Sequence, residues 1–214
     1  MAQNESLTVA GPAGKLEAIL MHPEGEPMGA AVVCHADPRQ GGMMHFKVVF
    51  RAAKALQEAG LAVLRFNFRG VGLSEGVHDH GQGEQEDARA ALGEVSRRFP
   101  RVPLLLGGFS FGSVVAARVA ESDSRVRGLF LLGFPVARVD DLAFLGALRI
   151  PRLFVQGDLD SFGTGHALRA AALPLPEPRV VVVVPEADHF FGGKLDALQD
   201  AIATWAAARP WRAA

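Results

Sequence analysis

The first regular pattern of the chain is a pair of short segments joined by a turn. Ser6–Val9 and Lys15–Met21 flank the four residues Gly-Pro-Ala-Gly at positions 11–14. Glycine and proline favour turns, and two strands that flank a short turn pair as an antiparallel hairpin. We therefore expect a hairpin at the beginning of the sheet.

Beyond the hairpin, mostly apolar segments alternate with segments of helical periodicity. The predicted strands are Ala30–Cys34, Leu61–Phe68, Pro103–Phe109, Val126–Leu132, Leu153–Gln156 and Val180–Val184. The predicted helices are Phe46–Ala59, Glu84–Phe99, Ser113–Ala120 and Lys194–Ala208. Strands that form continuous apolar runs are typical of parallel sheets covered by helices on both faces. The pattern predicts an α/β fold with a mostly parallel, doubly wound sheet.

The length of the chain fits one such domain. At 214 residues and 22.7 kDa, residues 1–214 are expected to form a single α/β domain. The connection between the strands ending at Leu132 and beginning at Leu153 is short, and a helix around Leu142–Leu148 would fill much of it. We therefore expect no separate cap domain.

Charge and composition exclude several function classes. Lys and Arg total 22 against 23 Asp and Glu, and this balance gives no electrostatic case for nucleic acid or an anionic membrane. No uncharged stretch has the roughly 20 apolar residues of a membrane span. The first six residues lack the basic and apolar regions of a secretory signal, so the expected location is the cytoplasm. The single cysteine, Cys34, lies in an apolar strand and is predicted to be a buried hydrophobe.

The most informative motif is Gly108-Phe109-Ser110-Phe111-Gly112, which lies between a predicted strand and a predicted helix of small residues. A serine on a sharp strand-to-helix turn is held in a strained conformation, and glycines two residues to either side make room for the turn. The motif alone is also compatible with an ordinary glycine-rich turn. Its context favours a nucleophilic serine at Ser110.

An acid and a histidine follow the serine in chain order. The strand Leu153–Gln156 leads to Asp158 and Asp160, and the strand Val180–Val184 is followed by His189. All of these polar residues come just after the carboxyl end of a predicted parallel strand. Open α/β sheets place their sites at these ends.

With this motif and order, the chain resembles the α/β-hydrolase superfamily from about residue 6 to about residue 208. It is most similar to the small, lidless branch of dienelactone hydrolases and bacterial carboxylesterases. The resemblance implies the α/β-hydrolase fold, with Ser110 as nucleophile and His189 as general base. The superfamily pattern has a glycine, two residues and then the acid, which selects Asp160 rather than Asp158. The implied activity is cleavage of a small-molecule carboxylic ester, without a metal or an organic cofactor.

The resemblance also implies an oxyanion hole of two backbone N–H groups. One belongs to Phe111, the residue after the nucleophile. The second belongs to the turn His-Ala-Asp-Pro at 35–38, which resembles the His-Gly-x turn of the superfamily and has Asp37 in the donor position. The Asp37 carboxylate would oppose an oxyanion, so we expect it to point away, towards Arg39 or Arg69. The alternative is an Asx turn without a catalytic role.

Other side chains carry weaker signals. The candidates for an apolar acyl pocket are Met43, Met44, Phe46, Phe109 and Phe190, although core packing explains each of them equally well. The histidines and acids of 76–87 are interpreted as a solvated loop before a helix rather than as a metal site.

Several functions share this set of residues. A thioesterase or an acyl-peptide hydrolase would need the same triad, and an inactive binding protein of the same fold is the alternative of a different class. The altered turn at Ala36 and Asp37 favours the inactive alternative, and the presence of all three triad residues favours an enzyme. Without a lid to cover a long chain, we expect acyl groups from acetyl to about hexanoyl. The physiological substrate and the oligomeric state remain open.

Overall fold

The computed structural model describes residues 4–212, which form an eight-stranded sheet with the order β1-β2-β4-β3-β5-β6-β7-β8. The strands are β1 (Asn4–Gly11), β2 (Gly14–Met21), β3 (Gly29–Cys34), β4 (Leu61–Phe66), β5 (Leu104–Phe109), β6 (Val126–Leu132), β7 (Arg152–Gly157) and β8 (Arg179–Val184). β1 and β2 form the predicted antiparallel hairpin, and β2 is also antiparallel to β4. β4, β3, β5, β6, β7 and β8 are parallel. The predicted mostly parallel sheet with an N-terminal hairpin is confirmed.

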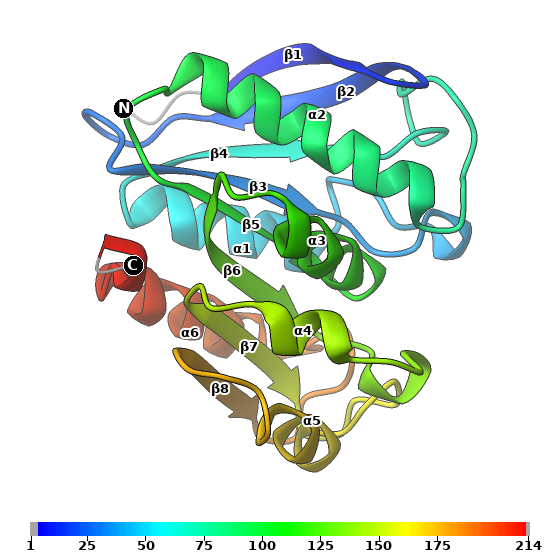
Figure 1. Cartoon of the computed structure of the whole chain (residues 1–214), viewed down its shortest axis with the longest axis vertical. Helices are drawn as coiled ribbons and strands as arrows, with labels where there is room; N and C mark the ends of the chain where they lie inside the picture. Colours follow the sequence, from blue (N-terminus) through cyan, green and yellow to red (C-terminus); the bar gives the residue numbers. More distant parts are fainter. Residues whose placement is uncertain (1–3, 213–214) are drawn as a thin grey trace.

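Helices cover both faces of this sheet (Figure 1). They are α1 (Lys47–Glu58), α2 (Gln82–Arg98), α3 (Phe111–Ser122), α4 (Ala143–Ala147), α5 (Gly165–Ala172) and α6 (Leu195–Ala207). One apolar cluster joins α2, α3, α4 and α5 to the sheet, and a second joins α1 and α6 to the other face. Successive residues of β3 belong alternately to the two clusters, as Val32 and Val33 do. The sheet therefore serves two cores, and its strands β3, β4, β5 and β7 are buried on both faces.

Three elements differ from the sequence-based expectation. The helix α5 was not predicted, because it has only eight residues and just two of its apolar side chains, Leu168 and Ala172, are buried. β4 ends at Phe66 rather than Phe68, because the Phe68 N–H donates to Nε2 of the His35 ring instead of to the backbone of β3. β8 is apolar but only half covered, with Val180 45% exposed, because it is the edge strand.

The connection between β6 and β7 contains only two short helical segments. These are the 3₁₀ turn Val136–Arg138 and α4, which falls within the predicted helix at 142–148. Neither forms a layer above the carboxyl ends of the strands. The expectation of a chain without a cap domain is confirmed.

Two glycines allow the loop after β3 to lie against the turn between β5 and α3. A Cβ atom at Gly108 would be 2.6 Å from the backbone of Gly112 and 2.7 Å from the carbonyl oxygen of Cys34. A Cβ atom at Gly112 would be 2.5 Å from the Cys34 carbonyl oxygen and still closer to that of His35. Real Cβ atoms do not approach backbone this closely, so only glycine permits this packing.

His35 fixes the beginning of that loop from inside the protein. Its side chain is fully buried, with Nδ1 2.7 Å from the carbonyl oxygen of Ala36 and Nε2 3.0 Å from the N–H of Phe68. Nε2 accepts from an amide and therefore carries no proton, so Nδ1 is the donor and the ring is neutral. Burial lowers the pKa of His35 to about 4. Protonation of Nε2 would remove the hydrogen bond that His35 accepts from the Phe68 N–H.

The packing predicts opposite effects of alanine at two helical glycines. Gly112→Ala should destabilise the protein by at least about 2 kcal/mol, because its methyl group meets fixed backbone. Gly93→Ala in α2 is the matched control, because its Cβ would find only Arg125 at 3.8 Å and should stabilise by roughly 0.5–1 kcal/mol. Urea unfolding followed by circular dichroism measures both changes. Equal effects of the two substitutions would show that backbone contact does not require glycine at position 112.

The low pKa of His35 predicts acid sensitivity. Between about pH 6.5 and pH 4 the unfolded chain binds a proton at this position and the folded protein does not, so stability falls as the pH is lowered. The full loss attributable to His35 is about 3 kcal/mol. Unfolding titrations from pH 7 to pH 4 should show a shallower decline for His35→Gln than for the wild type. Parallel declines in the two proteins would show that this imidazole is not responsible.

Candidate active site

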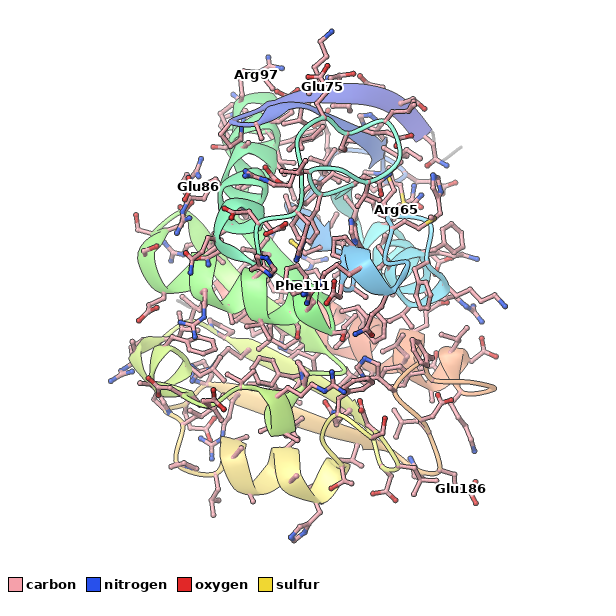
Figure 2. All side chains as sticks on the ribbon, turned by 90° about the vertical axis from the view of Figure 1, so that its right-hand side faces the viewer. Arg65, Glu75, Glu86, Arg97, Phe111 and Glu186 are labelled. Atoms are coloured by element: carbon pink, nitrogen blue, oxygen red, sulfur yellow. The ribbon has the colours of Figure 1, made fainter. Side chains whose placement is uncertain are left out.

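Ser110 occupies the turn between β5 and α3, at the carboxyl end of the sheet that faces the viewer in Figure 2. Its backbone has φ 55° and ψ −121°, a conformation that residues with side chains rarely adopt. The Ser110 N–H donates to Leu132 at 2.9 Å, and its carbonyl oxygen accepts from the Ser113 hydroxyl at 2.5 Å. These bonds hold the strained turn against β6 and α3.

His189 lies in the loop after β8, with its ring facing Ser110. The distance from His189 Nε2 to Ser110 Oγ is 2.9 Å. His189 is only 4% exposed, and aromatic rings surround its imidazole. The ring centroids of Phe162, Phe109 and Phe190 are 4.4, 4.9 and 5.2 Å away. This aromatic surround keeps the imidazole in one place and leaves one edge open towards the serine.

Asp160 holds the other side of the imidazole. Its carboxylate is fully buried, and Oδ2 lies 2.7 Å from His189 Nδ1. The same oxygen accepts from Gln156 Nε2 at 2.9 Å, and Oδ1 accepts from the Phe162 N–H at 2.8 Å. An acceptor at Nδ1 places the proton there and leaves Nε2 free to accept from Ser110.

Gln156 is a site residue that was not predicted from the sequence. Its side-chain amide donates both to Asp160 and, at 2.6 Å, to the carbonyl oxygen of Gly163. The available signal was a polar residue at the end of an apolar strand. A buried amide N–H group in such a place needs acceptors, and the acid loop supplies two of them.

Asp158, the neighbouring acid, lies elsewhere. Its side chain is exposed, and its backbone N–H donates to Val184 at 3.0 Å. Asp158 lies in the turn after β7, and within residues 4–212 no backbone N–H donates to its carboxylate. Of the two candidate acids, the structure brings only Asp160 to His189.

The two N–H groups predicted for the oxyanion hole are both free of protein partners within residues 4–212. Phe111 is the first residue of α3, so its N–H has no acceptor within the helix. Asp37 precedes a 3₁₀ turn, and in the described part of the chain its N–H likewise has no acceptor. Both residues line the same groove as Ser110. Figure 2 shows Phe111 near the centre of this face of the protein.

The carboxylate of Asp37 is turned away to Arg39. Oδ2 accepts from Arg39 Nη2 at 2.8 Å, and Oδ1 accepts from the Arg39 backbone and Nε at 2.9 and 3.1 Å. Burial alone would raise the pKa of Asp37, but the bonds from Arg39 outweigh it and hold the pKa below its usual range. The second expected partner, Arg69, instead pairs with the buried Asp87. The turn is therefore an Asx turn, and the N–H of Asp37 still has no acceptor within residues 4–212.

Ser110 opens into a groove of about 730 Å³ between α2, α3 and the segment after β6. Its apolar walls include Phe111, Val114, Val139 and Phe162. Four arginines, Arg39, Arg89, Arg118 and Arg138, also line it, together with the acids Asp37 and Glu121. These arginines were not predicted as site residues, because the separate segments that carry them meet only in the folded chain.

The predicted pocket residues divide into two groups. Met43, Phe46 and Phe190 line a second, apolar cavity of about 550 Å³, which does not include Ser110. Met44 and Phe109 are in the core, with exposures of 1% and 0%. Phe109 nevertheless stacks on Phe46 at 5.8 Å and contacts His189, so it belongs to the aromatic surround of the imidazole.

Two other residues singled out in the sequence, Glu84 and Cys34, are buried and support the fold. Glu84 is buried at the beginning of α2, where its carboxylate accepts from the N–H groups of Asp79 and Gly81. Cys34 is fully buried, as predicted, and burial raises the pKa of its thiol well above the usual range. Residues 4–212 contain no group of three or more His, Cys, Asp or Glu arranged to hold a metal ion. None of the helices in this range has the length and apolarity needed to cross a membrane.

Comparisons with known proteins place the chain in a family. Residues 33–208 match the model of the alpha/beta hydrolase domain. An alpha-beta serine hydrolase homologue from Coxiella burnetii is 37% identical, with 94% of this chain and 96% of that chain covered and a TM-score of 0.87. A serine hydrolase without lid from Xanthomonas campestris is 37% identical, with 97% and 94% covered and a TM-score of 0.88.

A curated protein from Rickettsia prowazekii, described as uncharacterized, is 33% identical over 200 residues, which are 90% of this chain and 84% of that protein. These matches cover nearly the whole chain, including the sheet, the serine turn and the short β6–β7 connection. The chain therefore belongs to the alpha/beta hydrolase family, and its fold is that of the family's lidless serine hydrolases.

Proposed function

We propose that this protein is a carboxylesterase that cleaves esters of short to medium acyl chains through an acyl-enzyme on Ser110. The observation that carries the proposal is the unbroken hydrogen-bonded chain from Ser110 through His189 to Asp160, with distances of 2.9 and 2.7 Å. A hydroxyl, an imidazole and a buried carboxylate in this order form the arrangement that activates a serine for acyl transfer.

In the first half of the reaction, Ser110 Oγ attacks the ester carbonyl carbon as His189 Nε2 accepts the hydroxyl proton. The imidazolium that forms is stabilised by the Asp160 carboxylate, which stays ionised. The bonds from Gln156 and Phe162 fix that carboxylate before the substrate arrives. When the tetrahedral intermediate collapses, His189 returns the proton to the leaving alcohol and the acyl group remains on Ser110.

The negative charge of the intermediate requires donors fixed in advance. The N–H groups of Phe111 and Asp37 fill this role in the proposal, and the dipole of α3 adds to the field at Phe111. The ion pair between Asp37 and Arg39 removes the objection that a carboxylate occupies this turn. The inactive alternative, which rested on that turn, loses its main support.

In the second half, water takes the place of the alcohol. His189 removes a proton from this water, the hydroxide attacks the acyl carbon, and the proton passes to Ser110 as the acid product leaves. Thioesters and aminoacyl amides would follow the same steps. Because the groove has no lid, long acyl chains would remain exposed to water, and we expect acetyl to hexanoyl groups to be preferred.

The nucleophile is tested by Ser110→Ala. The substitution should leave the unfolding curve unchanged and reduce kcat for p-nitrophenyl butyrate by about 10⁵-fold or more, because no other group forms the acyl-enzyme. A fluorophosphonate probe should label the wild type and not the variant. Matched acyl-thioester and aminoacyl amide substrates determine which bond is preferred. If folded Ser110→Ala retained activity within about tenfold of the wild type, the assignment would be wrong.

The acid is tested by comparing two neighbouring aspartates. Asp160→Asn should reduce kcat by about 10³- to 10⁴-fold, because an amide favours the wrong imidazole tautomer and does not stabilise the imidazolium. Asp158→Asn, two residues away and exposed, is the matched control and should change kcat less than about tenfold. Both are measured on folded protein at one pH. The opposite ranking would assign the role to Asp158.

A further inference from the structure

The groove that contains Ser110 has two kinds of arginine. Arg39 donates to the carboxylate of Asp37, and Arg89 donates to Glu86 and to the Ser122 hydroxyl. Arg118 and Arg138 line the same groove but have no carboxylate partner among residues 4–212. Two of the four cations are therefore neutralised by the described part of the protein, and two are not.

The two unpaired guanidinium groups are held by aromatic rings. Arg138 Cζ lies 4.1 Å from the centroid of Phe162, and Arg118 Cζ lies 4.3 Å from the centroid of Phe144. A cation–π contact of this kind needs no hydrogen-bond acceptor, and the side-chain N–H groups of both arginines have none among residues 4–212. The rings thus hold each cation in place and leave its donors available to an anion.

Arg138 is connected to the catalytic candidates through Phe162. The Phe162 ring that carries the guanidinium is 4.4 Å from the ring of His189, so one aromatic side chain separates the cation from the proposed base. The Phe162 N–H donates to Asp160, and its carbonyl oxygen accepts from Ala137 at 3.0 Å, beside Arg138. The position of Arg138 is therefore set by the same loop that positions the acid.

Arg118 lies farther along the groove. It follows Phe111 by seven residues of α3, or about 10 Å along the helix axis. Val114 and Val115 line the groove between them. An extended substrate would pass from Ser110 over an apolar stretch before it reached Arg118, whereas Arg138 stands near the reacting centre.

We propose that the substrate is an ester that also carries a carboxylate, such as a half-ester of a dicarboxylic acid, that Arg138 binds this carboxylate, and that Arg118 adds positive charge farther along the groove. The inference rests on the proposed esterase function and names its substrate class. A carboxylate matches the fork of donors on a guanidinium, and its single charge suits a groove in which Asp37 and Glu121 offset part of the positive charge.

The test compares two p-nitrophenyl esters of equal size. One is the half-ester of adipic acid, and the other bears a primary amide in place of the free carboxylate. The wild type should show a kcat/KM at least about tenfold higher for the carboxylate, mainly through KM, and the preference should shrink between about 0.05 and 0.5 M salt. Equal kcat/KM values for the two esters would overturn the proposal.

Three variants locate the effect. Arg138→Gln should reduce the preference to about twofold, with the neutral ester changed less than about threefold, and Arg118→Gln should reduce it by a smaller factor. Arg97→Gln is the control, because Arg97 pairs with Glu94 at the other end of α2 from the groove and should have no effect (Figure 2). An equal loss on both esters in Arg138→Gln would mean that Arg138 acts on His189 through Phe162 and not on the substrate.

Binding to Ser110→Ala separates this inference from the esterase function. Calorimetric titration with monomethyl adipate, and with its amide analogue, measures recognition without turnover. Preferential binding of the carboxylate that is lost in Ser110→Ala/Arg138→Gln would support the anion site even if the wild type hydrolysed neither ester. In that case the proposed esterase function would be wrong, and the proposed anion site would stand. Hydrolysis of both esters with no difference in binding would overturn the anion site and leave the hydrolase proposal intact.

Discussion

The close packing of three backbone segments is the constraint on which the rest of the candidate site depends. The end of β5, the first turn of α3 and the loop after β3 approach so closely that Gly108 and Gly112 have no room for a Cβ atom. This contact forces Ser110 into its strained conformation and brings the N–H of Asp37 into the same groove. The proposed nucleophile and both proposed oxyanion donors therefore share one cause. Their geometry is set by main chain, which cannot relax as a side chain can.

Around that rigid centre, side chains supply the groups that change protonation state. The imidazole of His189 stands among phenylalanine rings, and its two nitrogens bond to Ser110 and Asp160. A low-polarity surround strengthens those two bonds, because little water competes for them. Phe162 has two functions at once, since its N–H holds the acid while its ring contacts both the imidazole and Arg138.

The sequence predicted the features that depend on neighbouring residues and on the order of motifs along the chain. The apolar runs predicted the strands, and the glycine spacing around Ser110 predicted the sharp turn. The resemblance to the superfamily, whose pattern has two residues between a glycine and the acid, selected the aspartate that the structure places beside His189. Contacts between distant segments had no such signal. The stacking of Arg138 on Phe162 joins two connections that follow different strands, and Gln156 gained a role only because the acid loop folds back over it. The short α5 was missed because its amphipathic pattern covers barely two turns.

The order of the sheet also has a consequence for synthesis. The serine follows β5, whereas the histidine follows β8, which is the edge strand and pairs only with β7 among the described strands. A chain that leaves the ribosome from its N-terminus can complete the centre of the sheet before that edge strand exists. In the proposed mechanism Ser110 then remains an ordinary alcohol throughout this period, because its base has not yet been made. Under the proposed mechanism, reactivity would begin only when this edge strand docks, so a partly synthesised chain would carry no active nucleophile.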